Sequence, residues 1–492
     1  MTALPGTAAA VRCRRPFRVS SSRRLSGNRL AVLFGVLLLL LLPPLPGGPA
    51  QHAAEAATGA DLAARTPGAR EVFQMPRIVI EKGDETPASA PAGVTKPANQ
   101  PEERPVNRPV ITGWHSWKYN EFSSYDQLRV NLEKEGAKGQ KLLLSLNGLY
   151  YQEEDNKSWS SYLGESYYKF KAGSFDFKAG LLVDTLGSGD KVSFIDKINS
   201  RRYHNGLAND YNRDKKEVPA IKTTYYINKK MSWDFHYMPV FQASELPSIY
   251  GRWATAFQKE AARMVLLGTP MMREDDTRVR EQYHLGFNSA FKKYEIRYHY
   301  LWLKERLPVI DLAPRGYLRS EYPIDETFAV DGNVTLGKEF LMRYEMAWSP
   351  TKTFASWQDG RIGPRFQSNF FGMLLGTDKT YRNNLYLNVQ GILSHISKMQ
   401  TKTPYQLHPT EFMTSLQLKK GFRSETLFIE FNSLGNMTTG EYVLTPQMSL
   451  QRGDFLKFVA GVHVNGKSTD ALGPVGQFDE NNTPFLETQI IF

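Results

Sequence analysis

The sequence predicts an all-β protein, namely a transmembrane antiparallel up-and-down β-barrel of about 18 strands (16–18) that follows a disordered N-terminal segment. Three observations predict this fold. Hydrophobicity alternates with a period of two from residue 110 to the end, the alternating segments are about 10–13 residues long, and short connections alternate with long ones. Strands of soluble proteins have about five or six residues, whereas a tilted membrane strand needs ~9–11.

Residues 1–56 have the features of a signal peptide. Seven arginines precede the apolar run LAVLFGVLLLLLLPPL, and small residues follow at Ala54 and Ala56. The run from Leu30 to Leu42 is short of the ~20 residues that a membrane-spanning helix needs, although an uncleaved anchor helix stays an alternative. The only cysteine, Cys13, lies in this leader, so we expect no disulfide in the exported protein.

Residues 57–109 are rich in Pro and Ala, as in ETPASAPAGVTKPANQPEERPVNRP. Such a composition buries too little apolar surface to fold alone, and we interpret the segment as a disordered periplasmic tether. The barrel then occupies 110–492. Most of the net charge of +11 belongs to the leader, because the chain without residues 1–56 has 54 basic and 49 acidic residues. We therefore expect no nucleic-acid partner.

Counting the alternating segments gives 18 strands. An even number places both ends of the barrel on the periplasmic side, and all the short turns fall on that side too, while the long loops, such as 185–216 and 242–277, fall on the outer side. The expected strands are 110–121, 125–136, 140–153, 160–171, 173–184, 217–227, 231–241, 278–292, 294–306, 324–336, 338–348, 362–376, 383–396, 409–420, 424–434, 440–451, 454–465 and 482–492.

The segment FLMRYEMAW (340–348) illustrates the pattern. Phe340, Met342, Tyr344, Met346 and Trp348 share one face, and Leu341, Arg343, Glu345 and Ala347 share the other. The apolar face is expected to meet lipid and the mixed face a lumen, because a sheet in lipid must close on itself to pair every backbone group. The last strand ends at Phe492, and a terminal Phe is the signal that the barrel-insertion machinery reads.

Three stretches carry a resemblance to a known family. These are LGESYYKFKAGSFDFKAGLLVDTLGSGDKVSFIDKINSRRY (163–203), VPAIKTTYYINKKMSWDFHYMPVF (218–241) and EYPIDETFAVDGNVTLGKEFLMRYEMAW (321–348). Together they resemble a large, uncharacterised proteobacterial outer-membrane β-barrel family, a domain of unknown function, and the likeness covers most of 110–492 in order. The resemblance implies a porin-like barrel, with a channel for organic substrates as its function. The chain departs from the family at Leu181, Leu182 and Ser200.

No catalytic, cofactor or metal site is predicted. The nine histidines form no recognisable pair, and HExxH, GxSxG and P-loop motifs are missing from the sequence. His236, His299 and His463 are expected to point inward as water-exposed luminal residues. We therefore expect no enzyme. A barrel enzyme stays an alternative, and it would require clustered Ser, His and Asp in the lumen.

Charged residues on the mixed faces are the candidates for lining a pore. They have both signs, and opposed charges across a lumen select solutes by charge and size. The alternative is that these charges pair with each other and brace the wall. The candidates are Arg129, Glu133, Glu165, Lys169, Arg297, Arg343, Glu345 and Arg365.

The loop ELPSIYGRWATAFQKEAARMVLLG (245–268) predicts a helix. Ile249, Trp253, Phe257 and Val265 fall on one helical stripe, and Arg252, Lys259 and Arg263 fall on another. With its apolar stripe against the wall, this helix would narrow the mouth and disfavour cations. The alternative is a helix that lies on the rim.

The sequence thus predicts an outer-membrane channel for the diffusion of small solutes, with organic anions as candidates. The expected partners are outer-membrane lipid and lipopolysaccharide, the insertion machinery and the small solutes themselves. A structural sleeve or anchor for a periplasmic or surface partner, with 57–109 as its docking arm, is the alternative.

Overall fold

The computed structural model describes residues 110–492 except 121–122, 137–138, 154–155, 204–213, 274–280, 338–339, 382, 424, 467–472 and 474. The predicted leader 1–56 and tether 57–109 lie outside the described residues, so both stay predictions. Among the helices of the described part, none has the length and apolarity to cross a bilayer.

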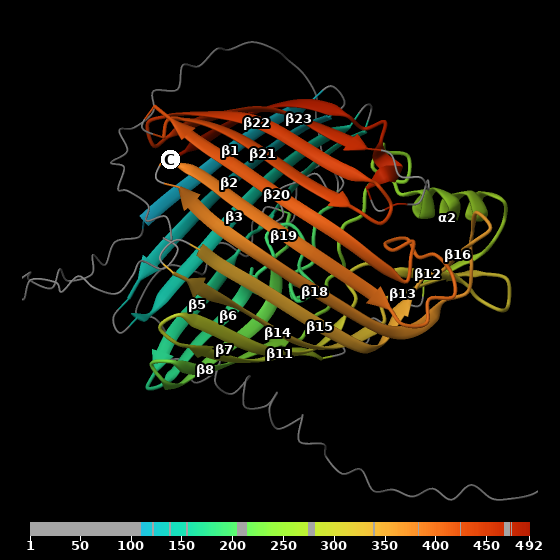
Figure 1. Cartoon of the computed structure of the whole chain (residues 1–492), viewed down its shortest axis with the longest axis horizontal. Coiled ribbons are helices and arrows are strands. Elements are labelled where there is room, and N and C mark those ends of the chain that lie inside the picture. Colours follow the sequence, from blue (N-terminus) through green and yellow to red (C-terminus); the bar gives the residue numbers. More distant parts are fainter. Residues whose placement is uncertain are drawn as a thin grey trace, which may run out of the picture. The chain divides into compact units, whose positions relative to one another are not determined.

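A closed antiparallel β-barrel forms the described part of the chain, as predicted (Figure 1). Each strand pairs with its neighbour in the chain, and the last strand pairs with the first. The strands are β1 (Val110–Asn120), β2 (Ser123–Glu135), β3 (Lys141–Glu153), β4 (Asn156–Leu163), β5 (Ser166–Ala172), β6 (Phe175–Leu182), β7 (Val218–Asn228), β8 (Met231–Met238), β10 (Gln282–Ala290), β11 (Tyr294–Lys304), β14 (Ile324–Leu336), β15 (Phe340–Phe354), β18 (Phe366–Tyr381), β19 (Leu385–Ile396), β20 (Thr410–Phe422), β21 (Leu427–Asn436), β22 (Tyr442–Arg452), β23 (Leu456–Gly466) and β24 (Thr483–Ile491).

These 19 segments make an 18-stranded barrel, because β4 and β5 both pair with β3 and are two halves of one strand. The interruption falls at Gly164 and Glu165, inside the strand predicted as 160–171. Two other strands are longer than predicted. β15 runs to Phe354, past a register shift between Ser349 and Lys352, and β18 runs to Tyr381.

The wall has one apolar and one polar surface, as the alternation predicted. On β15, Phe340, Met346 and Trp348 expose 41–46% of their surface, whereas Glu345 is fully buried. The exposed face is therefore apolar and the enclosed face is polar. This arrangement is that of a membrane barrel, in which the outside meets acyl chains and the strands share their backbone hydrogen bonds only with each other.

The first and last strands of the barrel are joined at Gly113 and Phe492. The backbone N–H of Phe492 donates to the Gly113 carbonyl at 2.9 Å, and the Gly113 N–H donates in return to the Phe492 carbonyl. A side chain at position 113 would overlap the Phe492 ring, so the glycine leaves the space that this ring occupies. The terminal phenylalanine therefore belongs to the closure of the barrel.

The long connections carry further structure at one end of the barrel, the end away from the C-terminus in Figure 1. A short sheet contains β9, β12 and β13, and a second contains β16 and β17. Helix α2 begins after a capping box between Thr255 and Gln258. The bounds are α2 (Ala256–Leu266), β9 (Met271–Arg273), β12 (Val309–Leu312), β13 (Leu318–Glu321), β16 (Trp357–Gln358), β17 (Arg361–Ile362) and the 3-10 turn η3 (Gly476–Phe478).

Candidate functional site

The connection between β6 and β7, predicted as the loop 185–216, lies against the inner wall of the barrel, a position that the sequence did not predict. We call its residues 184–203 the lumen loop. The buried carboxylate of Glu345, on β15, is its main anchor. This carboxylate accepts hydrogen bonds from the backbone N–H groups of Ser188 (3.2 Å), Phe194 and Ile195 (3.1 Å) and from the hydroxyl of Ser193 (3.0 Å). Such acceptors satisfy N–H groups that the fold removes from water.

A second anchor is Asp190 of the lumen loop. Its carboxylate accepts from the Arg343 guanidinium at 3.0 Å, and from the side-chain amides of Asn388 at 2.7 Å and Gln390 at 3.0 Å. Burial raises the pKa of Asp190 by more than the charge of Arg343 lowers it. The loop is thereby fixed to β19 as well as to β15.

Apolar packing holds the same loop. Its residues Ile195 and Ile198 are at most 1% exposed and form a cluster with apolar side chains of the wall. The Phe194 ring lies where any side chain on residue 372 would project, so Gly372 allows its close approach. The wall members of the cluster are Leu182, Val218, Ala220, Met238, Leu301, Leu303 and Ala347. Part of the barrel interior is therefore a packed core.

Ion pairs also hold the part of the lumen loop at Asp196 and Lys197. Lys197 contacts Asp325 on β14 at 2.6 Å, and Asp196 contacts both Arg201 and Lys215 at 2.8 Å. Burial lowers the pKa of Lys215, although the neighbouring Asp196 raises it in part. Buried charges are retained when they are paired in this way.

Two cavities adjoin the lumen loop. One, of about 370 Å³, is bounded by loop residues 185–187 and by β7, β8, β10 and β11 near their short-turn end. The other, of about 250 Å³, is bounded by residues from 191 to 203 of the loop and by 303–307. Because β11 contributes Glu295 and His299 to the first cavity and Leu303 to the second, the cavities lie at different heights along this strand.

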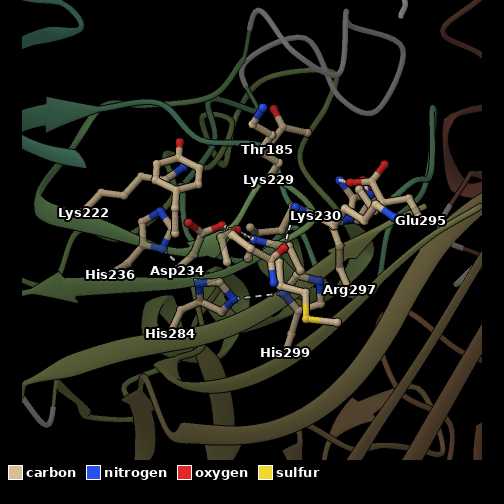
Figure 2. Close-up of a pocket in the computed structure, with 18 residues that line it drawn as sticks. Thr185, Lys222, Lys229, Lys230, Asp234, His236, His284, Glu295, Arg297 and His299 are labelled. Atoms are coloured by element: carbon tan, nitrogen blue, oxygen red, sulfur yellow. Dashed lines mark hydrogen bonds and ion pairs between the residues drawn. The ribbon is translucent and has the colours of Figure 1, made fainter. Parts of the chain in front are cut away.

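The first cavity is lined by many charged side chains. Figure 2 shows Lys222, Lys229, Lys230 and Arg297 around it, together with Asp234 and Glu295. Arg297 pairs with Asp331, and Lys222 contacts Asp184 at 3.2 Å. Burial raises the pKa of Asp184, but the hydrogen bond with His236 and the charge of Lys222 outweigh it and hold that pKa well below its usual range.

Three histidines stand in a row at the edge of this cavity, as Figure 2 shows. His236 Nδ1 lies 2.9 Å from His284 Nδ1, and His284 Nε2 lies 2.9 Å from His299 Nδ1. The row ends on two carboxylates, with Asp184 at 3.0 Å from His236 Nε2 and Asp331 at 2.7 Å from His299 Nε2. We call these five residues the histidine chain. Within the described residues no three His, Cys, Asp or Glu side chains are arranged to hold a metal ion.

The predicted pore-lining residues all have a polar partner. Arg297, Arg343 and Glu345 each contact the lumen loop. Arg365 pairs with Glu321 of β13, so it belongs to the long connections and not to a barrel strand. The other contacts are Arg129 with Asn147 (3.1 Å), Glu133 with Lys141 (2.6 Å), Glu165 with Lys178 (2.8 Å) and Lys169 with Asp176 (3.6 Å). Their role as pore lining stays a prediction.

The predicted helix in 245–268 exists, but its packing differs from the expectation. Phe257 is buried against Trp357 and the strands β12, β13 and β17, which belong to the long connections and not to the barrel wall. Val265 and Ile249, expected on the same stripe, are 41% and 40% exposed. The small sheets between the loops supply an apolar surface that the sequence does not reveal, and the helix packs there.

The three basic residues of that loop are dispersed. Arg252 donates to the carbonyl of Glu480 at 2.9 Å, Arg263 pairs with Glu260 at 2.6 Å, and Lys259 is exposed. The Glu260 carboxylate raises the pKa of Arg263. A constriction formed by these residues stays a prediction.

Sequence reasoning placed His236 and His299 correctly on the inward face, but the expectation that they are water-exposed is wrong, since they are 1% and 7% exposed. His463 is 7% exposed too. His284 and the loop residues Asp184 and Asp190 were not predicted as site residues. His284 stands opposite His236 in the ladder of β8 and β10, and this register is known only from the structure.

No family model and no curated protein matches the chain, so the comparisons give the resemblance to an uncharacterised barrel family no support. Similar solved structures include OccD3 (OpdP) of Pseudomonas aeruginosa, with 10% identity, a TM-score of 0.44 and coverage of 78% of this chain and 90% of that one. OccK5 (OpdH) of the same organism has 10% identity, a TM-score of 0.45 and coverage of 78% and 96%.

OccAB3 of Acinetobacter baumannii is also similar, with 10% identity, a TM-score of 0.46 and coverage of 78% of this chain and 98% of that one. These identities and TM-scores are low. The assignment as a porin-like membrane barrel therefore rests on the strand order, the closure and the two surfaces of this chain's own wall.

Proposed function

We propose that the protein is an outer-membrane channel for the passive diffusion of small solutes, and that the lumen loop forms its constriction. One observation carries the proposal: a closed barrel with an apolar exterior contains an anchored loop that adjoins a polar cavity at each of two heights. A loop fixed at Glu345 and Asp190 keeps one position, so the passage beside it has a defined width and charge.

Organic anions are the solutes that we propose. The first cavity exposes four cationic side chains and also the acids Asp234 and Glu295, which offset part of the charge. Lys222 and Arg297 pair with Asp184 and Asp331, and Asp234 and Glu295 accept from Asn288 and Asn333, so Lys229 and Lys230 stand together as two cations in the turn after β7. Lys229 and Lys230 have no ion-pair partner among the described residues. Their charge at the short-turn end would attract anions into the lumen.

Single-channel recording of the full chain in planar bilayers tests the proposal. We expect discrete conductance steps and, in a salt gradient, a reversal potential that indicates anion preference. Replacing Lys229 and Lys230 by Ala should shift that potential toward zero, whereas Lys419→Ala, on β20, should leave it unchanged. Folded protein that inserts but never conducts would overturn the channel.

The helix prediction gives a second candidate for the constriction. Replacing Arg252, Lys259 and Arg263 by Ala would change the ion selectivity if these residues narrowed the mouth. We expect substitutions in the lumen loop to change the ion selectivity more than this triple variant does, because the lumen loop contacts the wall at several strands. An unchanged reversal potential in the triple variant removes the helix from the constriction.

The apolar cluster inside the barrel favours the structural sleeve as a second function, since a packed core of Ile195 and Ile198 fills space that a wide pore would need. Deleting 57–109 separates the two functions. A channel keeps its conductance without the tether, whereas a sleeve loses its periplasmic or surface partner. We further propose that the strand ending at Phe492 addresses the chain to the insertion machinery and that the barrel contacts lipid and lipopolysaccharide.

A further inference from the structure

The number of hydrogen bonds in the histidine chain fixes the number of hydrogens that its imidazole rings must carry. Four contacts join Asp184, His236, His284, His299 and Asp331, and each contact needs one hydrogen. Both ends are carboxylates, which only accept when ionised. A neutral imidazole carries one N–H, so three neutral imidazoles supply three hydrogens for four contacts.

Both terminal carboxylates are ionised. Arg297 forks onto Asp331 with Nε at 3.1 Å to Oδ1 and Nη2 to Oδ2, and this bidentate pairing is the geometry of a guanidinium with a charged carboxylate. Asp184 contacts the Lys222 ammonium, and its pKa is held well below the usual range. Neither end therefore supplies the fourth hydrogen.

We infer that the histidine chain is a proton-binding site that holds one excess proton, shared among three imidazoles, and that this proton ties the lumen loop to the barrel wall. With the excess proton on His236, this ring donates to Asp184 and His284, His284 donates to His299, and His299 donates to Asp331. With the proton on His299, the two inner bonds reverse. All four contacts are satisfied in both forms, and His284 is neutral in each.

The backbone supports this arrangement. His236 and His284 are direct partners in the ladder of β8 and β10, whereas His299 stands opposite Gly286, two residues beyond His284. A side chain at Gly286 would press on the His284 ring at 3.1 Å, so the glycine lets that ring lean toward His299. The histidine chain runs across neighbouring strands, around the barrel and not along its axis. It is therefore suited to storing a proton and not to carrying one through the membrane.

Charged side chains surround the histidine chain. Two cations pair with its terminal carboxylates, Lys222 with Asp184 and Arg297 with Asp331. Among the described residues, the three imidazoles have hydrogen-bond contacts only with each other and with the two aspartates. The other charged groups that face the histidine chain are Lys178 on β6 with its partner Glu165, Lys215 beside Asp184, Lys229 and Lys230 in the turn after β7, Asp234 on β8, Glu295 on β11, and Glu345 on β15.

Loss of the proton has a defined consequence. Once one N–H is missing, two acceptors face each other at one contact, and this contact has to open. Only Asp184 belongs to the loop, while the other four residues stand on strands that the ladder holds in place. Raising the pH should therefore break the contact between Asp184 and His236, leaving Lys222 as the wall partner of Asp184, and remove one positive charge from the cavity.

The isosteric variant Asp184→Asn tests the inference. The carboxamide can donate one hydrogen to His236 Nε2 and still accept from Lys222, so three neutral imidazoles complete the chain without an excess proton. Nitrogen NMR of ¹⁵N-histidine-labelled full chain in lipid nanodiscs counts imidazolium groups directly. At neutral pH we expect one imidazolium in the chain of the wild type and none in Asp184→Asn.

His463→Gln is the matched control, because His463 faces inward on β23, bonds to Thr445 and lies outside the chain. It should keep the imidazolium. If Asp184→Asn fails to fold, His284→Leu serves instead, since without the middle ring each remaining histidine donates its single N–H to its own aspartate. Three neutral rings in the wild type, or an imidazolium that persists in the variant, would overturn the inference.

The NMR count does not depend on conduction, so the inference and the proposed channel fail separately. Where the protein conducts, the anion-to-cation permeability ratio of the wild type should fall as the proton is lost with rising pH. Asp184→Asn should show no such step. A silent protein with one imidazolium keeps the proton site and rejects the channel.

Discussion

The inner wall of the barrel differs between the strands that the lumen loop touches and the strands that it does not. On β15 and β19, Glu345, Arg343 and Asn388 give their polar groups to the loop. On β20 to β23, Glu430 accepts from Gln417 and Asn432 at 2.8 Å, and His463 contacts Thr445 at 3.1 Å, all within the wall. The same alternating pattern thus anchors a loop on one side and braces the wall on the other.

The difference follows from what a loop inside a barrel requires. Its N–H groups have lost water and must find acceptors, and buried unpaired groups cost about 1–3 kcal/mol each. Around Glu430 and His463 the wall of β20 to β23 has no such demand, and these side chains bond to neighbours within the wall. A pair of matched substitutions, one on each side, therefore separates anchoring from bracing.

Removing the Glu345 carboxylate should have the largest effect. Glu345→Ala leaves the N–H groups of Ser188, Phe194 and Ile195 without their acceptor, and we expect a loss of about 3–5 kcal/mol in the free energy of unfolding. Without this anchor, and with Arg343 as the remaining polar side-chain contact on β15, the loop should shift away from the proposed passage, so the single-channel conductance should rise. Urea unfolding in detergent and bilayer recording measure the two effects.

Glu430→Ala is the matched control, because its partners are side chains of the wall. It should cost less stability and leave the conductance unchanged. Equal conductance changes in the two variants would contradict the distinction between an anchoring and a bracing side. A rise in Glu430→Ala alone would place the constriction elsewhere.

Substitution of Gly372 should have the next largest effect. In Gly372→Ala the new Cβ would lie about 2.5–2.7 Å from atoms of the Phe194 ring, so the loop must shift. Overpacking of this kind costs about 1–3 kcal/mol. The comparison is Gly391→Ala, where the nearest atom stands at an ordinary contact distance of 3.6 Å. We expect a lower unfolding midpoint and altered conductance for the first variant, and neither change for the second.

The alternation of the sequence predicted the wall, the strand count and the inward face of Glu345 and Arg343, because a period of two is a local property. The lumen loop could not be predicted in this way. Ser188 and Glu345 are 157 residues apart, and nothing in either segment encodes the meeting. Likewise, the histidine chain depends on the register between β8, β10 and β11, and an error of one residue would turn His284 outward.

The smallest expected effect concerns the two aspartates of the loop, which should respond to pH with opposite signs. The pKa of Asp190 is raised in the folded protein, so the folded state binds its proton more readily than the unfolded chain does. Its contribution to stability is therefore largest at low pH and falls as pH rises through the folded pKa. The pKa of Asp184 is lowered, so its contribution is present above the ordinary pKa of about 3.9 and is lost as pH falls through the folded pKa.

Asp190→Asn mimics the protonated form, and it should gain stability relative to the wild type as the pH rises from 4 to 7. The gain should be ~0.5 kcal/mol or less, because the Asp190 side chain is 33% exposed and solvent screens its charge. Asp184→Asn should show the reverse in a His284→Leu background, which holds no excess proton, with a deficit that is smaller at pH 4 than at pH 7. With His284 present, loss of the excess proton from the histidine chain at rising pH would oppose this change. Urea unfolding at several pH values measures both slopes. Parallel slopes would mean that the two ends of the lumen loop meet the same environment, and the contrast between its anchors would fail.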